Sequence, residues 1–389
     1  MKRAGSRWLL AGLTVALFAA PLWRSARAHR AATSFRIPPR APTAATDAPF
    51  FREEFIETEP ATPTVHVASF CELPGGRLAA SWYGGSREGA RDVAIYLATH
   101  GSDAAAKWSA PTAVVTRESA TRELQRYVRK VGNALLFASE AGQLHLIYVS
   151  IAVGGWSGSS LNLKSSSDGG QTWTRSRRLA LSPFFNVSEL VKNHPTQLAD
   201  GGWAVPIYHE MLGKFPEILW LHDLDGSSLP RITKTRIAGG RTVFQPTLVP
   251  LGGRGALAFF RDASADKTLQ LARTDDAGAH WSEPVATPLP NPDSGLDALR
   301  LVDGRLLLAF NDSKTGRENL RLALSKDEGR SWQRVATLAE AAGAEFSYPS
   351  LTQTANGEIH VVFTWKRRAI KHVVFNTAWL SSAPRGAQP

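Results

Sequence analysis

Two arginines in this chain stand where they could bind a carboxylate together. Arg261 ends an apolar run, and Arg317 lies in the polar segment 311–318. Each guanidinium presents a planar fork of donors that matches the two oxygens of a carboxylate, so two arginines facing one channel would clamp an acidic group. The alternative is a local ion pair of each arginine with its sequence neighbour, Asp262 or Glu318.

Six polar residues open six similar segments of the chain, each an apolar run that leads to a glycine turn. They are His66, Asn133, His194, Gln245, Asp297 and Tyr348. They recur at intervals of about 50 to 70 residues, the length of a four-stranded propeller blade with its loops. Polar side chains at one phase of a repeat predict a ligand site. The alternative is that strand ends near solvent are polar for structural reasons alone.

Three turns of the chain share the pattern Ser/Thr-x-Asp-x-Gly-x-x-Trp. They occupy residues 166–173, 274–281 and 325–332. The Asp carboxylate can cap backbone N–H groups, the Gly supplies a positive φ, and the Trp can pack between adjacent sheets. We therefore interpret the pattern as a structural device and not as a metal site.

These repeats predict an all-β fold, a six-bladed β-propeller with four-stranded antiparallel blades over residues 61–382. A β-sandwich is the alternative, but it does not explain the repeated unit. In a propeller, the starts of the innermost strands share one face with the loops between second and third strands. Those loops carry Arg87, Glu88, Asp92 and Glu210. Residues 375–380 are expected to close the last blade as a strand.

The repeated turn resembles the Asp-box, or BNR repeat, of sialidases, and residues 64 to 380 resemble the sialidase-like family of six-bladed propellers. The resemblance implies a tyrosine nucleophile, three arginines around the substrate carboxylate and an acidic residue that serves as acid and base. Tyr348 matches the nucleophile, and Arg261 and Arg317 match the second and third arginines. Glu88 matches the acid and base better than Asp92, which adjoins the next strand and could simply cap it.

Two positions depart from this family pattern. His66 stands where the resemblance implies the first arginine, and Gln245 stands where it implies the glutamate that assists the tyrosine. Without that base, a phenol with a pKa of about 10 is a weak nucleophile. Glu210 and Glu345 are the candidates to replace it. The motif Phe-Arg-Ile-Pro at 35–38 matches the family's first-arginine motif, but no glycine turn follows it, and we interpret it as a coincidence.

The first thirty residues have the layout of an export signal. Lys2, Arg3 and Arg7 precede the apolar stretch 8–23, and Ala26-Arg27-Ala28 offers a cleavage site. We expect residues 1–30 to be a cleaved signal peptide or a retained membrane anchor. The protein is then exported, and it is periplasmic, membrane-anchored facing the periplasm, or secreted.

The linker composition and the distribution of charge narrow the possible domain layout and binding partners. Residues 31–60 are rich in Pro, Ala and Thr and are expected to form a linker. The net charge is +11, but much of the excess lies before Asp47, so the body of the chain has no basic face typical of nucleic-acid binding.

With the resemblance, these residues predict an exo-glycosidase that releases a terminal acidic sugar, a sialic acid or a related keto-acid such as Kdo, from a glycan. The catalytic candidates are Tyr348, Glu88, Asp92, Glu210 and Gln245. The substrate-binding candidates are Arg261, Arg317, Arg87, His66, Asn133, His194 and Asp297. The alternative is a catalytically inactive glycan-binding propeller, which the replacements at 66 and 245 favour. No cofactor is expected, and no metal, because His194 and His209 lack a third ligand at suitable spacing.

Overall fold

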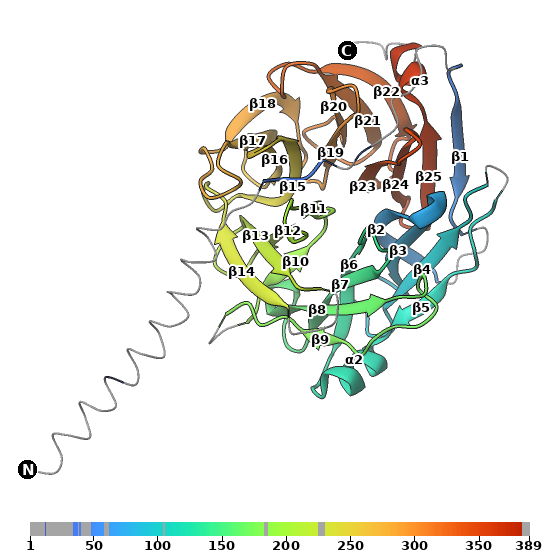
Figure 1. Cartoon of the computed structure of the whole chain (residues 1–389), viewed down its shortest axis with the longest axis vertical. Helices are drawn as coiled ribbons and strands as arrows, with labels where there is room; N and C mark the ends of the chain where they lie inside the picture. Colours follow the sequence, from blue (N-terminus) through green and yellow to red (C-terminus); the bar gives the residue numbers. More distant parts are fainter. Residues whose placement is uncertain are drawn as a thin grey trace, which may run out of the picture.

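The computed structural model describes residues 12, 34–37, 39, 48–57, 62–103, 106–182, 186–224 and 230–382. Six antiparallel sheets stand like blades around a central axis (Figure 1). Five sheets have four strands each, and the third has five because its innermost strand is split in two. This arrangement confirms the predicted all-β, six-bladed propeller.

The first three blades run in chain order, each from its innermost strand outward. Blade one contains β2 (Thr64–Leu73), β3 (Arg77–Gly85), β4 (Ala94–His100) and β5 (Thr112–Val115). Blade two contains β6 (Lys130–Ala138), β7 (Leu144–Ile151), β8 (Ser159–Ser166) and β9 (Arg177–Arg178). Blade three contains β10 (Glu189–Val191), β11 (Thr196–Gln197), β12 (Trp203–His209), β13 (Phe215–His222) and β14 (Arg231–Arg236).

The last three blades follow the same order, and a few helical turns connect the strands. Blade four contains β15 (Val243–Gly252), β16 (Gly255–Asp262), β17 (Thr268–Thr274) and β18 (Val285–Pro290). Blade five contains β19 (Asp297–Arg300), β20 (Leu306–Phe310), β21 (Asn319–Ser325) and β22 (Gln333–Glu340). Blade six contains β23 (Phe346–Gln353), β24 (Ile359–Trp365), β25 (Ala369–Phe375) and β1 (Phe51–Phe55). The helices are α2 (Arg117–Leu124) and α3 (Thr377–Ser382), with 3₁₀ turns at Pro74–Gly76 and Trp156–Gly158.

Blade six is closed by a strand from the N-terminal side of the chain. β1 pairs with β25 in antiparallel register from Phe51↔Phe375 to Phe55↔Lys371, so part of the expected linker 31–60 belongs to the propeller. The expected closing strand at 375–380 is therefore wrong. The Oδ1 of Asn376 accepts a hydrogen bond from the N–H of Trp379 at 2.9 Å, which caps the first turn of α3 and ends the strand.

Apolar clusters between neighbouring blades form the core. Ile147 and Val149 of blade two pack with Val205 and Leu219 of blade three, and all four are fully buried. Burying one such side chain contributes roughly 1.5–3 kcal/mol. Because β7 is buried along its whole length, its sequence is a nearly continuous apolar run and not an alternating one.

The three repeated turns have the structural role that the sequence predicts. In blade two, Asp168 Oδ1 accepts a hydrogen bond from the N–H of Thr172 at 2.9 Å, and Trp173 Nε1 donates to the carbonyl of Gly170 at 3.0 Å. The hydrogen bonds from Thr172 lower the pKa of Asp168 to about 2. The tryptophans are half-buried against the apolar clusters that join each blade to the preceding one: Trp173, Trp281 and Trp332.

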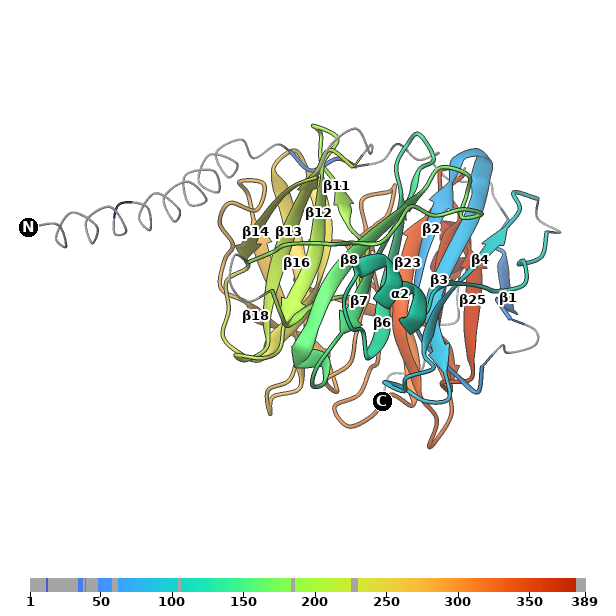
Figure 2. The same cartoon turned by 90° about the horizontal axis from the view of Figure 1, so that it is seen from below.

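Residues 34–37 lie across the face of the propeller that carries the glycine turns (Figure 2). Phe35 is buried, and its N–H donates to the carbonyl of Gly253 at 2.9 Å. The N–H of Arg36 donates to the carbonyl of Gln197 at 2.8 Å. Apart from Gly12, the expected signal or anchor segment lies outside the described residues. Within the part of the chain that the structure describes, no helix has the length and apolarity needed to cross a membrane.

Candidate active site

The innermost strands of several blades share an unusual backbone feature at their start. Asn133, Gln245 and Tyr348 have left-handed φ values of 32°, 50° and 53°, and each lies at a β-bulge. In blade one the left-handed residue is Val67, which follows His66. Such conformations cost of order 1–3 kcal/mol in residues other than glycine and cluster at functional sites. The end of the axis where the innermost strands begin is therefore the candidate site. We call it the upper mouth, although in Figure 2 it faces downward, opposite the glycine turns.

Tyr348 lies half-buried at the upper mouth among groups from other blades. Arg261 Nη1 donates to the Tyr348 hydroxyl at 3.4 Å and to Gln245 Oε1 at 3.2 Å. The guanidinium of Arg317 lies 5.4 Å from the centre of the Tyr348 ring, and the His66 ring meets it edge-on at 4.8 Å. Two guanidinium groups from neighbouring blades therefore lie beside the Tyr348 side chain.

The two arginines do not pair with their sequence neighbours. Arg261 Nε contacts Asp293 Oδ1 at 2.6 Å, whereas Asp262 accepts hydrogen bonds from Ser264. Arg317 Nη1 contacts Glu345 Oε1 at 3.2 Å, and its Nη2 donates to the carbonyl of Asp293 at 3.1 Å. Both guanidinium groups therefore face the upper mouth.

Arg367 adds a third guanidinium to this cluster. It lies in the turn between β24 and β25, with Nε 2.6 Å from Glu345 Oε2 and Nη1 2.6 Å from Glu88 Oε2. Burial alone would raise the pKa of Glu345, but hydrogen bonds from Arg367 and Ser347 outweigh it and lower that pKa to about 2. Glu345 is thus an anion bound between Arg317 and Arg367, and a weak base.

His66 does not supply the positive charge of the arginine that it replaces. The side chain is 1% exposed, and burial lowers its pKa to about 3, with Arg367 adding to the effect. Its Nδ1 lies 3.1 Å from the hydroxyl of Thr364. The 3.7 Å approach of Nε2 to Glu345 is therefore the contact of a neutral ring and not an ion pair.

Of the three candidates in the blade-one loop, Glu88 is the one bound into the cluster, through Arg367. Asp92 accepts hydrogen bonds from the N–H and the hydroxyl of Ser86, both at 2.9 Å, so it caps its own loop. Arg87 is exposed. Of these three side chains, Glu88 is thus the one that joins the arginine cluster at the upper mouth.

A buried phenol supports the other side of the upper mouth. The hydroxyl of Tyr208 accepts hydrogen bonds from Gln245 Nε2 at 3.0 Å and from Asn133 Nδ2 at 3.3 Å, and burial raises its pKa above the ordinary value. Glu210 lies just after the end of β12, which contains Tyr208, and burial also raises the pKa of Glu210, although Lys214 and Arg261 oppose the shift. Glu210 is therefore a stronger base than an exposed carboxylate.

Two of the six strand-opening residues, Asp297 and His194, do not lie at the upper mouth. Asp297 is fully buried and accepts hydrogen bonds from the hydroxyl of Thr247 at 3.0 Å and the N–H of Leu351 at 2.7 Å, so it joins three blades. His194 contacts Asp297 at 3.2 Å and lines a cavity of about 730 Å³ beside the glycine turns, at the opposite end of the axis.

A buried lysine, Lys192, lies between the upper mouth and the end of the axis that carries the glycine turns. Lys192 Nζ donates to Asn193 Oδ1 at 2.5 Å and to the carbonyls of Leu296 and Pro349 at 3.0 and 2.5 Å. Burial lowers its pKa to about 8, although Asp297 opposes the shift. The ammonium ties blades three, five and six together beneath Tyr348.

A model of the BNR repeat-like domain matches residues 76–361. The chain belongs to this family. No curated protein matches this BNR repeat-like chain.

Several solved structures share the fold of this BNR repeat-like protein. A Hadza microbial sialidase has a TM-score of 0.66 at 16% identity, over 83% of this chain and 67% of that one. The intramolecular trans-sialidase from Ruminococcus gnavus, in complex with oseltamivir carboxylate, has a TM-score of 0.65 at 15% identity, over 85% and 97%. A protein of unknown function from Dyadobacter fermentans has a TM-score of 0.65 at 13% identity, over 84% and 99%. At such identities the similarity shows the fold.

The sequence analysis missed four residues of this BNR repeat-like site: Arg367, Lys192, Tyr208 and Asp293. The position of Arg367 could have been recognised from the sequence, because it lies, like Arg261 and Arg317, at or next to the connection between the second and third strands of its blade. Its neighbours Lys366 and Arg368 are both basic, and three consecutive basic residues are typical of a solvent-exposed turn and not of a binding site. Nothing local distinguishes Lys192, whose partners lie on other blades.

Proposed function

We propose that the protein is an exo-glycosidase that releases a terminal acidic sugar, of the sialic-acid or related keto-acid class, from a glycan. One observation carries the proposal. The Tyr348 hydroxyl contacts Arg261 at 3.4 Å inside a cluster of three arginines from blades four, five and six. A potential nucleophile and a potential carboxylate clamp therefore occupy the same site.

The clamp is formed by Arg261, Arg317 and Arg367. Each guanidinium has five N–H donors, and its hydrogen bonds to the described residues involve two of its nitrogen atoms. The substrate carboxylate binds through the remaining donors and competes with Glu88 for Arg367. That competition frees Glu88 from its ion pair when substrate arrives.

The reaction proceeds by two displacements. Glu210 takes the proton of the Tyr348 hydroxyl as the Tyr348 oxygen attacks the anomeric carbon, and the bond to the leaving oxygen breaks. Glu88, which takes up a proton once the substrate carboxylate displaces it from Arg367, gives that proton to the leaving oxygen. A water then attacks the same carbon and gives a proton to Glu88, and the Tyr348 oxygen leaves and regains its proton from Glu210. Two inversions retain the configuration of the sugar.

Activation of Tyr348 is the weak point of this site. The amide of Gln245 cannot accept a proton, and Glu345, with a pKa of about 2, is a poor base. The donor from Arg261 stabilises the phenolate instead, and Glu210, whose pKa burial raises, is the available proton acceptor on the adjoining loop. Slow turnover is the expected result.

A glycan-binding protein without turnover is the second candidate. It is favoured by the neutral, buried His66 and by Gln245, which holds Tyr208 and Arg261 through its amide. Both candidates bind the same acidic sugar at the same residues.

We also propose that the protein is exported, on the layout of residues 1–30. Phe35 is docked on the face opposite Tyr348, so a retained N-terminal anchor would be connected to the propeller from that face.

The test is a screen of the purified protein against aryl glycosides of sialic acid, Kdo and uronic acids, with Tyr348→Phe as the matched variant. We expect the parent to hydrolyse at least one acidic glycoside and Tyr348→Phe to bind it without turnover. Equal turnover by both proteins would eliminate the tyrosine mechanism. Binding without turnover by the parent would favour the second candidate.

A further inference from the structure

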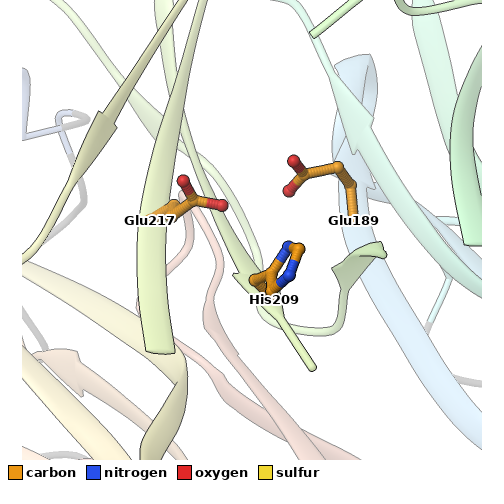
Figure 3. Close-up of side chains that lie close together, drawn as sticks. All are labelled: Glu189, His209 and Glu217. Atoms are coloured by element: carbon orange, nitrogen blue, oxygen red, sulfur yellow. The ribbon is translucent and has the colours of Figure 1, made fainter. Parts of the chain in front are cut away.

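Three side chains of blade three point toward one another (Figure 3). They are Glu189, His209 and Glu217, and one ligand atom from each lies within 4.8 Å of the others. The sequence analysis expected no metal because His194 and His209 lack a third ligand at suitable spacing. The neighbouring strands supply them.

Strand register explains the convergence. Glu189 of β10 pairs with His209 of β12, and Ile207 pairs with Glu217 of β13. Directly paired residues, and residues two apart on one strand, share a face of the sheet. This face packs on blade two through Ile207 and Leu219, so the cluster lies between the blades.

Two buried atoms of the cluster, Glu189 Oε2 and His209 Nε2, have no hydrogen-bond partner among the residues that the structure describes. The Glu189 side chain is only 2% exposed. Leaving a buried polar atom unsatisfied is unfavourable. Carboxylate oxygens and imidazole nitrogens are ligands of metal ions, and these three side chains point toward one another.

One ammonium contacts both carboxyl groups of the cluster: Lys234 Nζ lies 2.6 Å from Glu189 Oε1 and 3.1 Å from Glu217 Oε1. This ion pair accounts for Glu189 Oε1 but leaves Oε2 and the histidine nitrogen unused. Burial and the neighbouring Glu217 carboxyl nevertheless raise the pKa of Glu189, so a further cation at this point would stabilise its charged form. The Lys234 side chain is 23% exposed and can turn toward solvent if a divalent ion takes both carboxylates.

We propose that Glu189, His209 and Glu217 bind a divalent transition-metal ion of the Zn²⁺ type, with water completing the coordination. One imidazole nitrogen and two carboxylates are a normal ligand set for zinc, with bonds of about 2.0–2.2 Å. The upper limit of 4.8 Å between ligand atoms requires only a small closure of the side chains around the ion.

The ion would fix the end of β12 next to the upper mouth. It joins β10, β12 and β13 through one ligand each, and His209 directly follows Tyr208, whose hydroxyl binds Gln245 and Asn133. The site is thus a structural metal site that supports the candidate active site. It does not depend on the proposed glycosidase activity.

The test uses the whole chain, stripped of metal with a chelator and titrated with ZnCl₂ by calorimetry. We expect one Zn²⁺ per chain with micromolar or tighter affinity, and a higher melting temperature in excess Zn²⁺. Glu189→Gln and His209→Ala should weaken binding by about tenfold or more, because each removes one of three ligands. His280→Ala is the control, since this histidine contacts Asp276 but is 90% exposed on a turn of blade four.

Lys234→Met separates a metal site from a simple ion-pair network. The substitution removes the competing ammonium, so Zn²⁺ should bind at least as tightly as in the parent. The proposal is overturned if the metal-stripped parent binds no Zn²⁺. It is equally overturned if folded Glu189→Gln and His209→Ala proteins bind Zn²⁺ as tightly as the parent does.

Discussion

Replacing the three arginines around Tyr348 one at a time tests the carboxylate clamp in detail. Their side chains are exposed to different degrees: 12% for Arg261, 21% for Arg317 and 35% for Arg367. A hydrogen bond to a charged group contributes about 1.5–3 kcal/mol, and solvent screening reduces it as exposure rises. We therefore expect alanine to weaken binding by about a hundredfold at Arg261 and by about tenfold or less at Arg367, with Arg317 between them.

The assay is calorimetric titration with the acidic sugar that the parent binds best, and with its methyl ester as a neutral analogue. The parent should prefer the acid, and each variant should lose part of that preference while ester binding changes little. Arg305→Ala is the control, because this arginine pairs with Asp303 beside the glycine turn of blade five, away from Tyr348. Melting curves identify any variant that loses its fold, and Arg261→Lys then retains the charge without the planar fork. A parent that binds acid and ester equally, or three folded variants that bind the acid as the parent does, would refute the clamp.

Two further predictions concern the groups near Tyr348. Gln245→Glu places a carboxylate 3.2 Å from the same Arg261 nitrogen that contacts Tyr348. We therefore expect the turnover of an activated aryl glycoside to rise by about tenfold or more. Unchanged turnover would mean that removal of the Tyr348 proton does not limit the reaction. Glu345 has its pKa lowered to about 2 in the folded protein, against an ordinary value of 4.5, so it contributes stability above about pH 4.5 that is lost as the pH falls toward 2. The unfolding free energy of the parent relative to Glu345→Gln should therefore fall by up to about 3 kcal/mol across that range in denaturant titrations, and a constant difference would contradict the bound anion.

The repeat pattern was sufficient to predict the blades, because each strand pairs with the next one along the chain. The closure of blade six was not predictable in this way. β1 pairs with β25, more than 300 residues later, and Phe51-Arg-Glu-Glu-Phe55 carries no local sign of its partner. Asn376 also ended β25 by capping a helix, which an apolar pattern does not reveal.

Repeat phase also brought Tyr348, Gln245 and Asn133 to one place, because each sits at the same bulge of its blade. It failed for His194 and Asp297. The innermost strand of blade three is split into β10 and β11, and His194 lies between them. Blade five pairs β19 with β20 without a bulge, so Asp297 is not turned toward the upper mouth. These backbone irregularities, and contacts such as Arg367 with Glu345, depend on tertiary packing that one sequence does not display.

The most direct test of the central claim is whether Tyr348 forms a covalent bond with the sugar. A fluorinated, activated glycoside of the preferred acidic sugar slows the second displacement and lets the intermediate accumulate. Intact-mass and peptide-mass measurements should then show one sugar residue added per chain, on the peptide that contains Tyr348, and no addition to Tyr348→Phe. Continued turnover with no adduct, or an adduct on another residue, would contradict the account.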